Sequence, residues 1–106
     1  MIRGKDNTHD IIPFDIKDFQ NEIDEFPSSD NIGPVNSVDD LLDKAERILI
    51  RVYGEEIKNE KPFEVFYDEK HEIWMICGTL TPGYEGGAAN ILAEDRTGQV
   101  LAICAA

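Results

Sequence analysis

The sequence predicts an α+β fold in which one long helix packs on a strongly bent, four-stranded antiparallel meander. Apolar residues recur at helical spacing over residues 37–53, and after Gly54 the period changes to the two-residue alternation of strands. The links between the predicted strands are short, which favours antiparallel neighbours. A helix followed by a bent meander gives a half-cone of sheet wrapped around its helix.

Residues 1–36 are predicted to form an acidic N-terminal arm that carries one short helix. The apolar patch at residues 11–14 is either irregular or an edge strand that ends at Pro13, because proline donates no hydrogen bond to a sheet. The helix is predicted over about residues 15–26, and Pro27 ends it. Its apolar side chains fall on one helical stripe: Ile16, Phe19, Ile23 and Phe26.

The main domain is predicted to span residues 37–106, after a linker of turn-forming residues at 27–36. It begins with the long helix, for which Ser37 is a suitable N-cap with Asp40 three residues later. Gly54 suits the left-handed position that ends a helix. The apolar face of this helix is wide: Val38, Leu41, Leu42, Ala45, Ile48, Leu49, Val52 and Tyr53.

Four strands are predicted after the helix, at about residues 62–68, 72–80, 87–95 and 99–104. The second strand is apolar on both faces, so both faces must be covered. Its side chains alternate: Ile73, Met75 and Cys77 on one face, and Trp74, Ile76 and Leu80 on the other. Glycines at 78, 86 and 87 allow the strands to bend, and Gly98 suits the left-handed position of the last turn.

The charge of the chain limits its partners. Acidic residues outnumber basic residues by 22 to 10, a formal net charge of −12. Nucleic acid and anionic membranes both need a positive protein surface, so neither is expected as a partner. The sign favours a basic protein partner, unless the acidity serves solubility alone. No apolar run approaches the ~20 residues of a membrane helix, and the start carries no secretory signal, so the expected location is the cytoplasm.

The two cysteines, Cys77 and Cys104, both lie in predicted buried strands. They are interpreted as reduced thiols that behave as small apolar side chains. A disulfide is possible only if the two strands are neighbours in register. A catalytic cysteine needs a histidine nearby, and His9 and His71 show no recognisable pairing pattern.

Five motifs in the main domain together carry a family resemblance. They are, in chain order, Ala45…Ile48…Tyr53-Gly54, Lys61-Pro62-Phe63, Trp74-Met75-Ile76-Cys77-Gly78-Thr79-Leu80, Gly86-Gly87-Ala88-Ala89-Asn90-Ile91 and Gly98-Gln99-Val100-Leu101-Ala102-Ile103. In this order they resemble the bacterial immunity proteins with a nuclear-transport-factor-2-like, or cystatin-like, fold, which are found beside polymorphic toxin genes. The resemblance covers about residues 37–104; each motif alone is weak, and their combination is fairly specific.

The resemblance implies a cytoplasmic antitoxin that binds a cognate toxin and occludes its active site or an exosite. It implies the same cone-like fold, and it brings no catalytic residue, metal or cofactor. Its shared motifs are fold-forming, so they do not mark an interface. The chain departs from the family where it ends at Ala105-Ala106, because a polar tail is expected there, and residues 1–36 lie outside the resemblance.

Two sets of residues are predicted to contact the partner. Between Asp6 and Asp30, eight acidic residues stand against Lys17 alone, a net charge of −7. Such a cluster either steers a basic toxin or is a solvated face, and its spacing fits no metal-binding loop. In the loop at 81–87, an exposed tyrosine between glycines suits a binding hot spot, unless the loop is an ordinary connection. The predicted contacts are Asp18, Glu22, Asp24, Glu25, Tyr84 and Glu85.

Two alternatives to toxin binding stay open at this stage. A cone of this kind can hold a small ligand or an active site, for which the candidate groups are Tyr53, Tyr67, Asp68, His71 and Trp74. Of these, Trp74 is interpreted as a core residue, and Asp68 and His71 as turn residues. The other alternative is a structural homodimer; the expected state is a monomer or weak homodimer.

Overall fold

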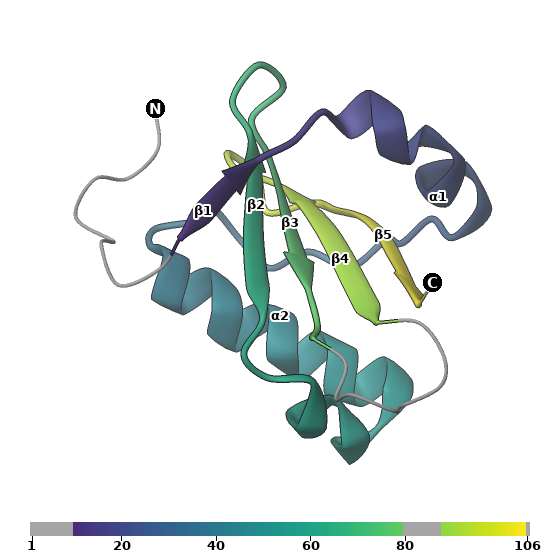
Figure 1. Ribbon diagram of the computed structural model, residues 1–106. Coiled ribbons are helices and arrows are strands. Elements are labelled where there is room, and N and C mark those ends of the chain that lie inside the picture. Colours follow the sequence, from purple (N-terminus) through teal and green to yellow (C-terminus); the bar gives the residue numbers. More distant parts are fainter. Residues whose placement is uncertain (1–9, 80–87, 106) are drawn as a thin grey trace.

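The computed structural model describes residues 10–79 and 88–105. One mixed sheet with the strand order β1-β2-β3-β4-β5 separates two helical layers (Figure 1). The elements are β1 (Ile11–Pro13), the 3-10 helix η1 (Ile16–Phe19), α1 (Gln20–Glu25), α2 (Val38–Tyr53), the 3-10 helix η2 (Glu55–Glu60), β2 (Glu64–Asp68), β3 (Ile73–Cys77), β4 (Ala89–Glu94) and β5 (Val100–Ala105). The predicted α+β fold, a long helix on an antiparallel meander, is confirmed.

The sheet has five strands where the sequence predicts four. The extra strand is β1, which pairs in parallel with β2 so that Ile11 lies opposite Val65 and Ile12 opposite Phe66. Three residues are too short to show a period, so the hydropathy pattern cannot identify such a strand. The alternative of an edge strand ending at Pro13 is the one the structure adopts.

Helix α2 begins and ends where its capping residues predict. The Ser37 hydroxyl accepts a hydrogen bond from the backbone N–H of Asp40 at 3.1 Å, and Gly54 follows the last turn with φ of 95°. The side chains of Val38, Leu41, Ala45 and Leu49 are buried against the sheet. Burying a side chain of this size contributes about 1.5–3 kcal/mol, so this stripe holds α2 in place.

Three residues predicted to lie on buried helical stripes are exposed. Val52 and Tyr53, in the last turn of α2, are 47% and 39% exposed, so the apolar face of α2 is shorter than the pattern suggests. Phe26 is 47% exposed because α1 ends at Glu25. Phe26 leaves helical geometry with φ of −127° and ψ of 50°, which turns it off the stripe.

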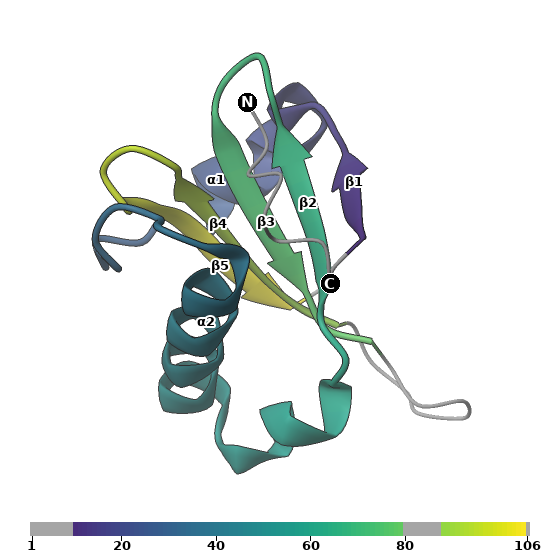
Figure 2. The same cartoon turned by 90° about the vertical axis from the view of Figure 1, so that its left-hand side faces the viewer.

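The face of the sheet opposite α2 is covered by the N-terminal segment. Helices α1 and α2 lie on opposite sides of the sheet (Figure 2). On this face, buried residues of η1 and the sheet form an apolar cluster: Ile16, Ile73, Met75, Leu92 and Ala102. Partly buried residues pack at its rim: Phe14, Phe19, Ile23, Phe66 and Leu101. The predicted alternation of side chains in β3 is confirmed for four residues: Ile73 and Met75 face this cluster, and Trp74 and Ile76 face α2. Leu80 lies outside the described residues.

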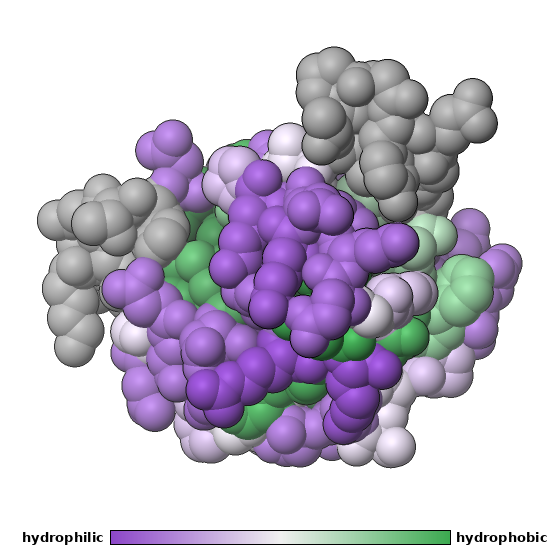
Figure 3. Space-filling model, turned by 90° about the horizontal axis from the view of Figure 1, so that it is seen from below, coloured by the Kyte–Doolittle hydropathy of each residue, from purple (hydrophilic) through white to green (hydrophobic). Residues whose placement is uncertain are grey.

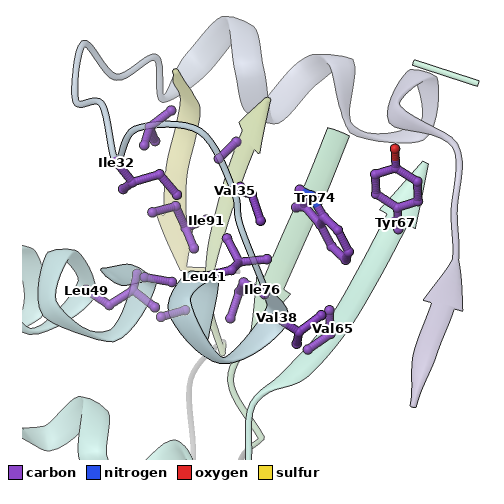
Figure 4. Packing of buried hydrophobic residues seen from close by; sticks show 14 of the residues in the cluster. Ile32, Val35, Val38, Leu41, Leu49, Val65, Tyr67, Trp74, Ile76 and Ile91 are labelled. Carbon is purple, nitrogen blue, oxygen red and sulfur yellow. The ribbon is translucent and has the colours of Figure 1, made fainter. Parts of the chain in front are cut away.

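The main core lies between α2 and the sheet (Figure 4). Trp74 is 1% exposed, as its interpretation as a core residue predicts. Its ring packs on Tyr67 with ring centroids 4.4 Å apart, and its indole N–H donates to the Asp95 carboxylate at 2.8 Å. The polar atom of the indole therefore has a partner although the ring is buried.

The segment after α1 covers the open edge of β5. Bridges join Pro27 to Ala102 and Asn31 to Gln99. Arg51 of α2 forms an ion pair with Asp30 at 2.6 Å, which ties this segment to the helix on the other face. An uncovered sheet edge is prone to pair with other chains, so the segment predicted as a linker also protects the sheet.

Cys77 and Cys104 are free thiols in strands that are not neighbours. Both lie opposite Asn90 of β4, which puts their Cα atoms about 9–10 Å apart, too far for a disulfide. Burial, with a contribution from nearby carboxylates, raises the pKa of Cys77 to about 11. Burial also raises the pKa of Cys104, so both thiols stay protonated at neutral pH. Within the described residues, no helix has the length and hydropathy to cross a membrane.

Candidate partner-binding surface

The four acidic residues predicted to contact a partner lie on one short helical segment. Asp18 is in η1, and Glu22, Asp24 and Glu25 are in α1. Asp18, Asp24 and Glu25 are exposed, whereas Glu22 is half-buried. We call the surface formed by these four residues the acidic face. The other predicted contacts, Tyr84 and Glu85, lie outside the described residues.

Local hydrogen bonds shape the segment that carries the acidic face. The Asp15 carboxylate accepts the backbone N–H of Lys17 at 2.9 Å and so caps η1. The side-chain amide of Gln20 donates to Asp24 at 3.1 Å, a pairing of residues one helical turn apart. Because Ile16, Phe19 and Ile23 pack on the sheet, Asp18, Asp24 and Glu25 are left facing away from it.

Asp68 anchors this segment to the sheet. Its carboxylate is 3% exposed and accepts the backbone N–H of Ile16 at 2.8 Å. It also accepts the backbone N–H of His71 at 3.0 Å and contacts His71 Nδ1 at 2.8 Å. Burial alone would raise the pKa of Asp68, but these hydrogen bonds outweigh it and hold the pKa below its usual value.

The interpretation of Asp68 as a turn residue is therefore wrong. It is the last residue of β2, and its side chain points into the layer that joins the sheet to η1. Its carboxylate, with Asp15 and His71, also places three possible metal ligands within 4.8 Å of one another. The backbone donors already occupy both Asp68 oxygens, so the arrangement is accounted for as an anchor.

Within the described residues the acidic face has no ion pairs, whereas the α2 side of the molecule has several. Ion pairs in and around α2 and η2 join Asp40 to Lys44, Asp43 to Arg47, Glu46 to Lys61 and Glu55 to Lys58. The face viewed from below is mostly hydrophilic (Figure 3). Among the described residues, no ion pair involves Asp18, Glu22, Asp24 or Glu25. The charges of these four side chains are therefore not neutralised by an ion pair within the described part of the chain.

The candidate groups for ligand binding do not converge on one hollow. Tyr67 and Trp74 are buried in the core under α2, whereas Asp68 points to the opposite face of the sheet. Tyr53 is partly exposed at the end of α2. A hollow of about 250 Å³ is lined by His71, Glu72, Glu94, Arg96 and Thr97, and a groove of about 340 Å³ lies between α2 and residues 61–63. Neither brings together the tyrosine, histidine and aspartate that acid–base chemistry in a cone requires.

A comparison with known protein families shows which family the chain belongs to. A family model described as NTF2 fold immunity protein matches residues 42–105. The chain belongs to this family. The resemblance that the motifs predict is confirmed, and the twisted sheet with α2 on one face is the fold of an NTF2-like immunity protein. No curated protein and no solved structure matches the chain.

The family match leaves out the segment that carries the acidic face. It begins at residue 42, inside α2, and η1 and α1 precede it. The sequence does indicate that this segment packs on the sheet. The stripe of Ile16, Phe19 and Ile23 needs an apolar partner, and β3 is apolar on both faces. No sequence pattern indicates the anchor at Asp68. The layer formed by η1 and α1 thus lies outside the matched residues, although it packs on the same sheet.

Proposed function

We propose that this immunity protein binds a cognate toxin through the acidic face and blocks the toxin's active site or an adjacent exosite. The observation that supports this most is the contrast in charge pairing. Four acidic residues of α2 and η2, Asp40, Asp43, Glu46 and Glu55, form ion pairs with basic neighbours, whereas the four acids of η1 and α1 have no such partner among the described residues. Unpaired charge on a surface fixed by the sheet is available to a basic partner.

A basic toxin suits this surface because opposite charges speed diffusional encounter and disfavour wrong partners. Toxins that act on nucleic acid carry a basic substrate site, so a nuclease is the class that the charge favours. The immunity protein would work in the cytoplasm as a binder, in a one-to-one complex and without catalysis. Tyr84 and Glu85 stay predicted contacts, which the affinity of a Tyr84→Ala variant would test.

Co-production with the toxin tests the proposal directly. The probe is the C-terminal domain of the large open reading frame next to this gene, produced in bacterial cells with and without the immunity protein. We expect growth to stop with the toxin domain alone, to recover with both, and a one-to-one complex to be purified. Growth arrest that the immunity protein does not relieve, with no complex on size-exclusion chromatography, would rule out the proposed function.

Neutralising the acidic face should slow association with the toxin. In the variant Glu22→Gln/Asp24→Asn/Glu25→Gln we expect the association rate at low salt to fall about tenfold and its salt dependence to flatten, because steering acts mainly on the on-rate. The measurement is stopped-flow or biosensor kinetics over a range of ionic strength.

A matched variant controls for net charge. Asp43→Asn/Glu46→Gln/Glu55→Gln removes the same number of negative charges from residues that are already in ion pairs. We expect its association rate to stay within about twofold of the wild type, since exposed pairs contribute little. Equal slowing in both triple variants would mean that total charge alone matters and that the acidic face is not the contact.

A further inference from the structure

Phe26 is a large apolar side chain that the structure keeps half exposed at the end of the acidic face. It is 47% exposed, as much as any large hydrophobic side chain in the described part of the protein. It directly follows Asp24 and Glu25 in sequence. A single exposed apolar residue is ordinary on a protein surface, so its backbone and its neighbours decide whether it matters.

The backbone of Phe26 is fixed on both sides. Its N–H donates to the carbonyl of Glu22 at 2.9 Å, and its carbonyl accepts the N–H of Ile103 of β5 at 3.2 Å. The next residue, Pro27, is bridged to Ala102. The aromatic ring is therefore presented by a rigid segment, which lowers the entropy lost when a partner orders it.

Glu22, one helical turn before Phe26, carries a carboxylate oxygen without a hydrogen bond. Its Oε2 atom is buried and has no partner among the described residues. A buried acceptor left without a hydrogen bond is unfavourable. The backbone N–H of Phe26 donates to the carbonyl of Glu22, so the residue with the unsatisfied oxygen is adjacent to Phe26 at the end of α1. A donor brought in by a partner would remove that cost.

We infer that this corner, formed by Glu22, Glu25 and Phe26, is the docking site for an arginine side chain of the toxin. The inference rests on the proposed function and names the chemistry of its contact. A guanidinium group stacks on an aromatic face, and its planar fork donates to carboxylates in two directions at once. A lysine ammonium has the charge without the flat stacking surface, so arginine fits this combination better.

The other exposed apolar residues do not offer the same combination. Val52 and Tyr53 lie at the end of α2, beside Arg51. The acid nearest to them in sequence, Glu55, is paired with Lys58 at 2.9 Å. Tyr53 is a matched control because it is an exposed aromatic residue, and the buried carboxylate oxygens without a hydrogen bond among the described residues belong to Glu22 and Asp40, not to residues adjacent to Tyr53 in sequence.

The test compares Phe26→Leu with Tyr53→Leu. Leucine keeps an apolar side chain of similar size, so it preserves packing while it removes the aromatic face. Against the toxin domain used for growth rescue, we expect Phe26→Leu to weaken binding about tenfold, mainly through faster dissociation. We expect Tyr53→Leu to change the affinity less than twofold. Unchanged affinity in Phe26→Leu, with the wild type binding normally, overturns the inference and leaves the proposed function intact.

A second experiment, with short basic peptides, tests the arginine site separately from toxin binding. Hexa-arginine peptide titrated into the ¹⁵N-labelled immunity protein should shift the amide resonances of residues 22–27 more than those of α2, and hexa-lysine should shift them less. The Phe26→Leu variant should lose this difference between the peptides. Equal shifts with both peptides, or shifts centred on α2, overturn the inference even when no toxin complex has been obtained.

Discussion

Replacing Gly98 with alanine is expected to destabilise the protein by about 3–4 kcal/mol. Gly98 has φ of +73°, which costs an alanine about 1–2 kcal/mol. A Cβ atom there would also overlap backbone atoms of Gly33, which cannot move as a flexible side chain would. The backbone carbonyl of Gly98 accepts the N–H of Ile32 at 2.9 Å, so the strain would reach the segment that covers β5.

Gly54 provides the control for this prediction. It also has positive φ, of +95°, but no atom lies within 4 Å of the position its Cβ would take. Gly54 has ψ of −179°, in a region that glycine almost alone adopts, so Gly54→Ala should cost only the conformational part, about 1–3 kcal/mol. Urea unfolding followed by circular dichroism measures both free energies. Equal losses in the two variants would show that the close approach of residues 33 and 98 does not constrain the fold.

Removing the Asp68 carboxylate should cost about 3 kcal/mol of unfolding free energy. In Asp68→Ala the backbone N–H groups of Ile16 and His71 lose their acceptor, and each unsatisfied buried donor costs about 1–3 kcal/mol. The control is Asp43→Ala, which breaks only an exposed ion pair with Arg47 and should cost less than about 1 kcal/mol. Similar losses in both variants would contradict the role of Asp68 as an anchor.

The contribution of Asp68 should also depend on pH in a defined direction. Its pKa in the folded protein lies below the ordinary value, which is about 3.9 in an unfolded chain. The stabilisation is therefore fully present above about pH 4 and is lost as the pH falls through the lower folded value. The difference in stability between the wild type and Asp68→Ala should shrink as the pH falls below 4. A difference that grows on acidification would contradict this.

The elements that the sequence predicted correctly are those with strong local signals. Ser37 and Gly54 mark the ends of α2 through capping chemistry that acts within one turn. Strands β2 to β5 follow from alternation, and the register of β3 between its neighbours places each of its residues on the expected face. Gly98 adopts positive φ as its turn predicted.

The features that the sequence did not reveal depend on tertiary contacts. Strand β1 is defined by a partner more than fifty residues away, and its short apolar patch fits an irregular segment equally well. Asp68 is the last residue of a strand and precedes a turn, so nothing local distinguishes a buried anchor from a solvated turn residue. The sequence pattern places Phe26 on the apolar stripe of a helix, but α1 ends one residue before it, at Glu25.

The candidate surface was predictable in part. The clustering of acids before Asp30 is visible in the sequence, whereas their lack of ion pairs is a property of the fold. Lys44, Arg47, Arg51, Lys58 and Lys61 all form their pairs in or near α2 and η2. Three of the pairs have the local spacing of helical ion pairs. The pairs Arg51–Asp30 and Lys61–Glu46 join distant parts of the chain, so no sequence pattern shows that these two basic residues do not pair with the acidic face.

Amide hydrogen exchange of the immunity protein, alone and bound to the toxin domain, tests the proposed contact most directly. We expect exchange to slow in the complex across residues 16–27, which carry the acidic face and Phe26, and to stay unchanged over η2 and the solvent side of α2. Slowed exchange confined to α2 and η2, with residues 16–27 unaffected, would contradict the account.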